Sequence, residues 1–329
     1  MPFQQLSQDS FMEVLVLEDM KGRDFLTLQD FSAEELKSML NLSQDLKAEQ
    51  LKGEEHHLLK GKTLAMIFQK ASTRTRVSFE VGMWQLGGSA LFLSSGELQL
   101  GRGEPIKDTG RVLSRYVDGI MIRTFDHEEV EELAEHSDVP VVNGLTDLLH
   151  PCQVLADLLT IKEKFKDLKN LKIAYFGDGN NVAHSLLLGC SKMGVHISIA
   201  SPDGYGPREH IVTQAGENAL KTGSSVFITK DPAQAADGAD VLYTDVWTSM
   251  GREEEKQQRR KIFSPYQVNT ALLEKASPRA LVMHCLPAYR GEEITEEVLE
   301  GKRSVVLDQA ENRMHAQKGL LSMLMGEKG

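Results

Sequence analysis

Five consecutive hydrogen-bonding residues, Ser72-Thr73-Arg74-Thr75-Arg76, stand between an apolar stretch and an apolar helical pattern. Turns are more often built from Gly, Asn, Asp and Pro. The backbone N–H groups at a helix N-terminus are unpaired, and the helix dipole is positive there. Hydroxyls and guanidinium groups at such a place predict an oxyanion site that suits phosphate. A simple helix cap with solvated arginines is the structural alternative. We favour anion binding because five such residues occur together.

Two later positions could bind a carbonyl group. Arg123 ends the strand pattern GIMIR, and ligands in open α/β sheets bind outside such strand ends. Taken alone, a surface salt bridge is the better interpretation of this arginine. His150 and Gln153 are three positions apart at the start of a helical stretch, so they project from the same turn. A neutral histidine can donate to a carbonyl oxygen. A lone histidine is more often structural, and only its pairing with Gln153 favours a site.

Glycine, aspartate and cysteine end three further strand patterns. Gly177 and Gly179 resemble the start of a dinucleotide fingerprint, but Val182 occupies the third glycine position, and the adjacent asparagines suit a polar small molecule at least as well. Asp245 could hold an ammonium group. Cys285 reads most simply as a small buried residue. Since neighbouring strand residues point to opposite faces, His284 should point away from Cys285, and we expect no histidine–cysteine dyad.

Composition restricts the class of protein. The chain has 329 residues, 41% of them hydrophobic and 26% charged, with a net charge of -11. This acidic balance argues against nonspecific nucleic-acid binding. The three cysteines show no metal-ligand or disulfide spacing, which favours a reducing compartment. The sequence has neither an apolar run long enough for a membrane span nor a recognisable leader. We therefore expect a cytoplasmic protein with no membrane partner.

The elements that must position these residues alternate between strand and helix. This rhythm predicts an α/β fold with two domains, each a parallel β-sheet flanked by helices on both faces. We expect a first domain over 22–155, a second over 156–310, a terminal helix 311–329 that joins the first domain, and an appendage over 1–21. Val77, Val81 and Trp84 form a helical stripe after the first strand. SVVLDQA, residues 304–310, is expected as the last strand.

Four signatures occur in a specific order: S-T-R-T-R at 72–76, H-P-x-Q at 150–153, D-x-W-x-S-M-G at 245–251, and H-C-L-P at 284–287. This series resembles the aspartate/ornithine carbamoyltransferase family, from about residue 22 to the C-terminus. The ornithine side of the family is indicated by H-C-L-P, where the aspartate enzymes usually carry H-P-x-P. The resemblance implies transfer of a carbamoyl group from carbamoyl phosphate to the side-chain amine of L-ornithine, giving L-citrulline and phosphate. Arginine biosynthesis is the expected direction.

The resemblance also implies roles for individual residues. Arg74, Arg123, His150 and Cys285 are expected to act in catalysis, with no metal and no organic cofactor. The expected ligands of carbamoyl phosphate are Ser72, Thr73, Arg74, Thr75, Gln99, Arg123, His150, Gln153, Cys285, Leu286 and Arg313. Gln99 would reach a neighbouring subunit, which implies a homotrimer or a multiple of it. The expected ornithine ligands are Asn181, Asp245, Ser249 and Met250. Gln69 stands where the family often has an acid.

Three alternatives stay open. A carbamoyltransferase for putrescine or an acylated ornithine would keep the phosphate residues and alter the acceptor residues, and the intact Ser249-Met250-Gly251 counts against it. A nucleotide-dependent dehydrogenase would need the glycine that is missing at position 182. A catalytically silent homologue would be expected to have lost Arg74, His150, Asp245 or Cys285.

Overall fold

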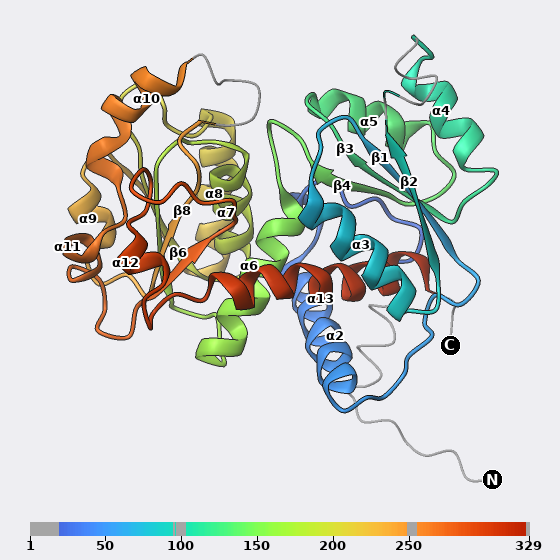
Figure 1. The fold of residues 1–329 in the computed structure, drawn as a ribbon, viewed down its shortest axis with the longest axis horizontal. Coiled ribbons are helices and arrows are strands. Elements are labelled where there is room, and N and C mark those ends of the chain that lie inside the picture. The colour runs from blue at the N-terminus through green and yellow to red at the C-terminus, as the bar shows by residue number, and fades with distance from the viewer. Residues whose placement is uncertain (1–19, 95, 97–102, 249–254, 327–329) are drawn as a thin grey trace. The chain divides into compact units, whose positions relative to one another are not determined.

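The computed structural model describes residues 20–94, 96, 103–248 and 255–326. The chain divides into two compact units. Unit 1 comprises Met1–Thr146 and Arg313–Gly329, and unit 2 comprises Asp147–Asn312. Figure 1 labels most of the helices and several strands of both. Each unit is built on one parallel sheet, as the strand–helix alternation predicted.

Unit 1 has a four-stranded sheet in the order β2-β1-β3-β4. Its strands are β1 (Thr63–Phe68), β2 (Ser89–Ser94), β3 (Gly119–Arg123) and β4 (Val141–Leu145). Ala65, Ile67 and Ile122 point to the face covered by α4 and α5, where they form an apolar cluster. The other face carries α3 and α13 (Figure 1). The helices are η1 (Leu28–Asp30), α2 (Ala33–Leu51), α3 (Thr73–Gln85), α4 (Ile106–Leu113) and α5 (His127–Glu135).

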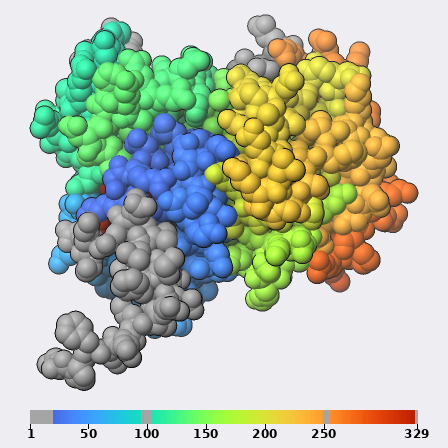
Figure 2. Space-filling model, turned by 180° about the vertical axis from the view of Figure 1, so that it is seen from behind, coloured from blue at the N-terminus to red at the C-terminus, as the bar shows by residue number. Residues whose placement is uncertain are grey.

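The start of α2 follows local rules closely. The Ser32 hydroxyl accepts the Glu35 N–H, and the Glu35 carboxylate accepts the Ser32 N–H, which completes a capping box. The segment before α2 joins the sheet, since Phe25 bridges Val142. In Figure 2 the blue residues, which comprise this segment and α2, lie at the surface beside green residues of the same unit. The described chain begins at Met20, which is fully buried.

Unit 2 has a five-stranded sheet in the order β7-β6-β5-β8-β9. Its strands are β5 (Lys172–Phe176), β6 (His196–Ala200), β7 (Val226–Thr229), β8 (Val241–Thr244) and β9 (Leu281–His284). One face packs on short helices through a cluster that includes Phe176, Leu242 and Val282. The helices are α6 (Pro151–Phe165), α7 (Asn181–Lys192), α8 (Glu209–Thr222), α9 (Pro232–Ala236), α10 (Lys256–Phe263), η4 (Ser264–Tyr266), α11 (Thr270–Leu273) and α12 (Glu296–Leu299).

One expectation about an element is wrong. SVVLDQA is not a strand: only Ser304 makes a bridge, to Val282, and α13 (Val306–Met325) already begins within this stretch. The stripe at Val77, Val81 and Trp84 predicted a helix, and α3 is present there, but the side chains of Val77 and Trp84 are 50% and 76% exposed. The core side of this helix is formed instead by residues that include Phe79 and Met83. Among the described residues, no helix is long and apolar enough to cross a membrane.

Candidate functional site

The hydroxyl row of unit 1 lies where β1 passes into α3. Ser72 caps α3 in extended conformation, and its hydroxyl accepts the Thr75 N–H at 3.2 Å. Thr75 is buried, whereas Thr73 and Arg74 are exposed in the first turn. The capping interpretation is therefore correct for the Ser72 side chain. It leaves the other members of the row beside the positive end of the helix.

Two arginines of unit 1 border this row. Arg123 ends β3 beside Phe68 of β1, and its carbonyl accepts the Gln69 N–H at 2.9 Å. Arg313 of α13 donates from Nη2 to Thr75 Oγ1 at 3.4 Å. Both arginines are almost fully buried. The fold thus brings Arg123 and Arg313, which are far apart in the sequence, to the end of one strand–helix junction.

Arg76 has a structural role. Its Nε donates to Glu80 at 2.9 Å, and its guanidinium lies 3.8 Å from the centre of the Phe92 ring. This agrees with its absence from the expected ligands. Gln69, which departs from the family pattern, donates from Nε2 to Glu129 at 2.9 Å. A carboxylate at position 69 would face another carboxylate there.

In unit 2, His150 and Gln153 open α6. His150 is its N-cap, and the backbone N–H of His150 donates to Ser185 Oγ at 2.8 Å. Both His150 and Gln153 are buried, and Gln153 Nε2 donates to Asp157 Oδ1 at 2.8 Å. The pairing that favoured a site in the sequence is therefore realised in one helical turn.

His184 of α7 holds the segment that precedes His150. Its Nδ1 donates to the Leu148 carbonyl at 2.9 Å, and its Nε2 accepts the Arg208 N–H at 3.0 Å. An amide can only donate, so this ring must be neutral with its proton on Nδ1. Burial lowers the pKa of His184 from 6.5 to about 4, which agrees with that assignment.

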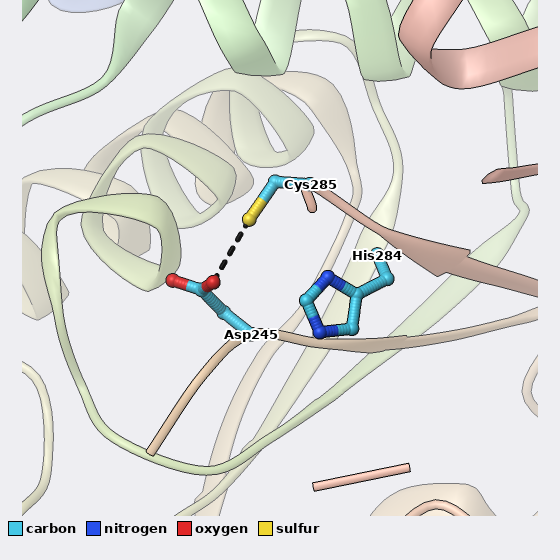
Figure 3. Close-up of side chains that lie close together, drawn as sticks. All are labelled: Asp245, His284 and Cys285. Atoms are coloured by element: carbon cyan, nitrogen blue, oxygen red, sulfur yellow. Dashed lines mark hydrogen bonds between the residues drawn. The ribbon is translucent and has the colours of Figure 1, made fainter. Parts of the chain in front are cut away.

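Asp245 and Cys285 meet at the carboxyl edge of the unit 2 sheet (Figure 3). The Cys285 thiol donates to Asp245 Oδ1 at 2.9 Å. The same carboxylate accepts the Val246 N–H and the Asn180 side-chain amide, each at 2.8 Å. They meet because β8 pairs with both β5 and β9, so the residues that follow these strands are neighbours. Asn181, the expected ornithine ligand, is the first residue of α7.

His284 lies closer to Cys285 than alternation along a strand predicted. Ligand atoms of Asp245, His284 and Cys285 all lie within 4.8 Å of one another, the only such group among the residues described. β9 ends at His284, so the alternation of a regular strand does not extend to Cys285. Both ring nitrogens of His284 are already engaged, one accepting the Leu286 N–H at 2.9 Å and the other 3.0 Å from Glu293. A metal ion there would displace one of these contacts, and Figure 3 shows no hydrogen bond from the ring to the thiol.

The glycines at 177 and 179 are explained by packing. A Cβ on Gly179 would lie 2.2 Å from the backbone nitrogen of Pro207. The Gly179 N–H also donates to the Tyr205 carbonyl at 2.7 Å, so the chain crosses this glycine directly. Gly177 has a φ of 133°, which favours glycine. The local backbone therefore requires both glycines without any nucleotide.

Some site residues lie outside the described part of the chain, namely Gln99, Ser249 and Met250. The structure also reveals positions that the sequence did not single out. The side-chain amide of Asn180 donates to the Asp245 carboxylate. Arg259 is fully buried and forms an ion pair with Asp178. Asp157 was signalled only by its place four residues after Gln153, which puts the two on one helical face.

Two domain models of one protein family match this chain. The carbamoyl-P binding domain model of aspartate/ornithine carbamoyltransferases matches residues 23–163, and the Asp/Orn binding domain model matches residues 169–324. The chain belongs to the aspartate/ornithine carbamoyltransferase family.

Three of the similar proteins are named ornithine carbamoyltransferase. An ornithine carbamoyltransferase of Anoxybacillus flavithermus is 58% identical over 306 residues, 93% of this chain and 98% of that protein. The Bacillus subtilis ornithine carbamoyltransferase is 57% identical over 314 residues, 95% of this chain and 97% of that one. The solved structure of ornithine carbamoyltransferase from Pyrococcus furiosus matches with a TM-score of 0.91 at 55% identity, covering 93% of this chain and 98% of that chain.

Proposed function

We propose that this chain is an ornithine carbamoyltransferase, which transfers the carbamoyl group of carbamoyl phosphate to the side-chain amine of L-ornithine and releases L-citrulline and phosphate. The observation that carries the acceptor assignment is the buried Asp245 carboxylate, which Asn180 and Cys285 hold at the sheet edge. A carboxylate fixed in this way suits a substrate ammonium or amine group. Relatives that share more than half of their residues with this chain bear the same name.

The proposed roles follow the chemistry of each side chain. The helix start at 72–75 and Arg313 bind the phosphate group. Arg123 and His150 donate to the carbamoyl oxygen, and Gln153 and the Leu286 carbonyl bind the carbamoyl amide. Asn181, Asp245, Ser249 and Met250 bind ornithine. Cys285 lies between the two substrates.

The reaction balances with these groups alone. The unprotonated side-chain amine attacks the carbamoyl carbon, and the bond from that carbon to the phosphate oxygen breaks. Phosphate leaves and takes up the amine proton, so no protein base is required. Arg74, Arg123 and His150 stabilise the developing oxygen charge. Removing one such preorganised donor commonly costs roughly 3–4 kcal/mol.

We propose a homotrimer or a multiple of it. The exposed face of α3 supports this assembly, since Val77 and Trp84 are seven residues apart and lie on one side of the helix. Leu91, on the edge strand β2 of the same unit, is 49% exposed. A second copy of the chain is the occupant that we assign to this apolar surface, with Gln99 reaching the neighbouring site. Mixing inactive Gln99→Ala and Arg74→Ala chains should restore part of the activity, and fully inactive mixtures would contradict this arrangement.

The cellular setting is part of the same proposal. We infer a cytoplasmic enzyme of arginine biosynthesis, since the cysteines described are free thiols. The similar solved structure from Campylobacter jejuni and the relative from Pyrococcus furiosus are both named anabolic ornithine carbamoyltransferases.

One assay tests the function directly. Purified protein is given carbamoyl phosphate with ornithine, putrescine, N-acetylornithine or aspartate, and the carbamoylated product is measured. Turnover with ornithine alone is expected. Turnover only with another amine would overturn the roles of Asp245 and Ser249, and no turnover at all would favour the silent homologue. Arg74→Ala should abolish most turnover, whereas Arg76→Ala, matched in chemistry but engaged with Glu80, should retain it.

A further inference from the structure

A buried glutamate–histidine pair adjoins Cys285 at the end of β9. The side chains of His284 and Glu293 are both fully buried, and His284 Nε2 lies 3.0 Å from Glu293 Oε1. The other ring nitrogen, Nδ1, accepts the backbone N–H of Leu286 at 2.9 Å. The proposed reaction uses Cys285 and the Leu286 carbonyl, but it assigns no role to His284 or to Glu293.

These contacts determine where the proton of the histidine ring lies. An amide N–H can only donate, so Nδ1 of His284 must be unprotonated. A neutral ring then carries its proton on Nε2, which donates it to the Glu293 carboxylate. Without that acceptor the proton could move to Nδ1, where it would face the Leu286 N–H, donor against donor. Glu293 therefore keeps the ring in the one neutral tautomer that can hold Leu286.

The same carboxylate oxygen holds a second backbone amide. The Tyr289 N–H donates to Glu293 Oε1 at 2.6 Å. The stretch from Leu286 to Tyr289 is thus restrained at both ends by one side chain, through His284 at the first end and directly at the second.

Leu286 benefits from this restraint because its backbone is strained. Its φ of 56° lies in the left-handed region, which a residue with a bulky side chain disfavours. Residues in such conformations persist where the surrounding contacts over-determine them, and they concentrate at functional sites. The His284 ring restrains the N–H of this strained residue, and the proposed function assigns its carbonyl to the carbamoyl amide.

We propose that Glu293 is a positioning residue for carbamoyl phosphate: through His284 it holds Leu286 in the backbone conformation that directs the Leu286 carbonyl to the carbamoyl NH₂ group. This inference rests on the proposed function, in which that carbonyl binds the carbamoyl amide. Glu293 acts through His284 and needs no contact with either substrate. Apolar side chains often fill a fully buried position at no loss of stability. The carboxylate is explained instead by the tautomer that it selects.

Two substitutions of Glu293 separate positioning from stability. Glu293→Ala removes the acceptor and lets the His284 proton move to Nδ1. Glu293→Gln keeps the acceptor, because the amide oxygen must face the two donors, His284 Nε2–H and Tyr289 N–H. Its NH₂ group then takes the place of Oε2, a buried atom with no hydrogen-bond partner among the described residues, so this variant loses stability as well. Stability should fall in both variants, whereas only Glu293→Ala loses the acceptor.

The measurements compare ligands with and without the carbamoyl group. Calorimetry gives the dissociation constants of carbamoyl phosphate and inorganic phosphate, citrulline formation gives kcat and both KM values, and urea unfolding gives stability. In Glu293→Ala the affinity for carbamoyl phosphate should fall roughly 5- to 50-fold, because the hydrogen bond to the Leu286 carbonyl is lost. Inorganic phosphate should bind within about twofold of wild type. The KM for carbamoyl phosphate should rise by a larger factor than the KM for ornithine, and Glu293→Gln should recover most of the lost affinity.

Gln267→Ala is the matched control. Gln267 Nε2 donates to the carbonyls of Gly291 and Glu292 at 3.2 and 2.8 Å. It therefore supports the residues next to Glu293 through groups that the contact from Glu293 to His284 and Leu286 does not use. This variant should lose stability and keep the wild-type affinity for carbamoyl phosphate.

A structural role alone gives a different pattern. Equal losses for carbamoyl phosphate and inorganic phosphate in Glu293→Ala would overturn the proposal, and so would an affinity that follows stability across all three variants. Should Glu293→Ala fail to fold, two variants of His284 decide. His284→Asn keeps an oxygen near the place of Nδ1 that can accept the Leu286 N–H, whereas His284→Leu does not. Tighter binding of carbamoyl phosphate by His284→Asn is expected, and equal affinities would contradict the proposal.

Failure of the proposed function is recognised separately. A wild-type chain that forms no citrulline from ornithine overturns the proposed function and this inference with it. Citrulline formation together with an unchanged affinity for carbamoyl phosphate in Glu293→Ala overturns this inference alone.

Discussion

Arg259 is the largest side chain that is fully buried in the described part of the chain. Its guanidinium pairs with Asp178, donates to the Trp247 carbonyl, and lies 4.9 Å from the ring centres of Tyr205 and Phe263. The arginine therefore connects α10, through its contacts, to the segments that follow β5 and β8. Asn181 and Asp245 lie in or next to these segments. Removing its counter-charge should destabilise unit 2 and disturb the acceptor residues.

The change is Asp178→Asn. Breaking a buried ion pair by removing one partner costs about 3–5 kcal/mol, because the other charge is left uncompensated. The Asp178 side chain is 15% exposed, and the half-exposed Glu255, 3.4 Å from Arg259, remains as a partner that compensates the charge only in part, so we expect the lower end, about 3 kcal/mol. For a unit of this size, that loss lowers the unfolding temperature by roughly 6–12 °C. The double variant Asp178→Asn with Arg259→Met should be more stable than the single variant, since it removes the uncompensated charge.

Thermal and urea unfolding followed by circular dichroism measure both effects. Arg279→Gln is the matched control, because this arginine also pairs with an aspartate but its side chain is 65% exposed. Its cost should stay below about 1 kcal/mol. A single variant as stable as the control, or a double variant no better than the single one, would refute the reasoning from burial.

Three further outcomes are expected. Asp245→Asn should lower kcat/KM for ornithine roughly 10- to 150-fold, because it removes a hydrogen bond to a charged group. The affinity for carbamoyl phosphate, measured by calorimetry, should stay unchanged. An equal loss for both substrates would contradict the role assigned to Asp245. His184 has a pKa of about 4 when folded and 6.5 when unfolded, so the unfolded chain binds the extra proton between these values. Stability should fall by about 3 kcal/mol from pH 7 to pH 4 relative to His184→Gln, and identical pH profiles in urea unfolding would exclude this. Burial lowers the pKa of Lys318 from 10.5 to about 8. The free energy of unfolding of wild type relative to Lys318→Met should therefore rise by about 3 kcal/mol between pH 8 and pH 10.5. A stability difference that does not change with pH would show that Lys318 titrates normally.

Local patterns predicted most of the fold. The capping box at Ser32 and the cap at Ser72 depend on neighbouring residues alone, and both are present. That Asp245 and Cys285 lie at the same edge of the sheet follows from a more general rule, since strands of a parallel sheet end at one edge. The order of the strands was needed to know that these two residues are neighbours, and the sequence does not contain it.

The failures have physical causes. The spacing of Val77 and Trp84 predicted the helix but not which of its sides is buried, because apolar spacing does not distinguish an interior from a surface that a second chain would cover. The apolar residues Val305, Val306 and Leu307 read as a strand because short apolar runs fit either element. The contact of Asn180 with Asp245 joins residues that follow two different strands, which no local pattern encodes.

The C-terminal part of α13 has a consequence for how the protein is made. Unit 1 includes residues from Arg313 onward, and these last residues fill its interior: the Gly22 N–H donates to the Leu324 carbonyl, and Lys318 bonds Gln50 and Gln85. On the ribosome, the first 146 residues therefore emerge without the helix that completes them. Unit 2 is continuous in sequence and can fold before synthesis ends. Unit 1 is thus translated first but completes its fold last. Until α13 packs on it, its apolar face is exposed and can bind a chaperone.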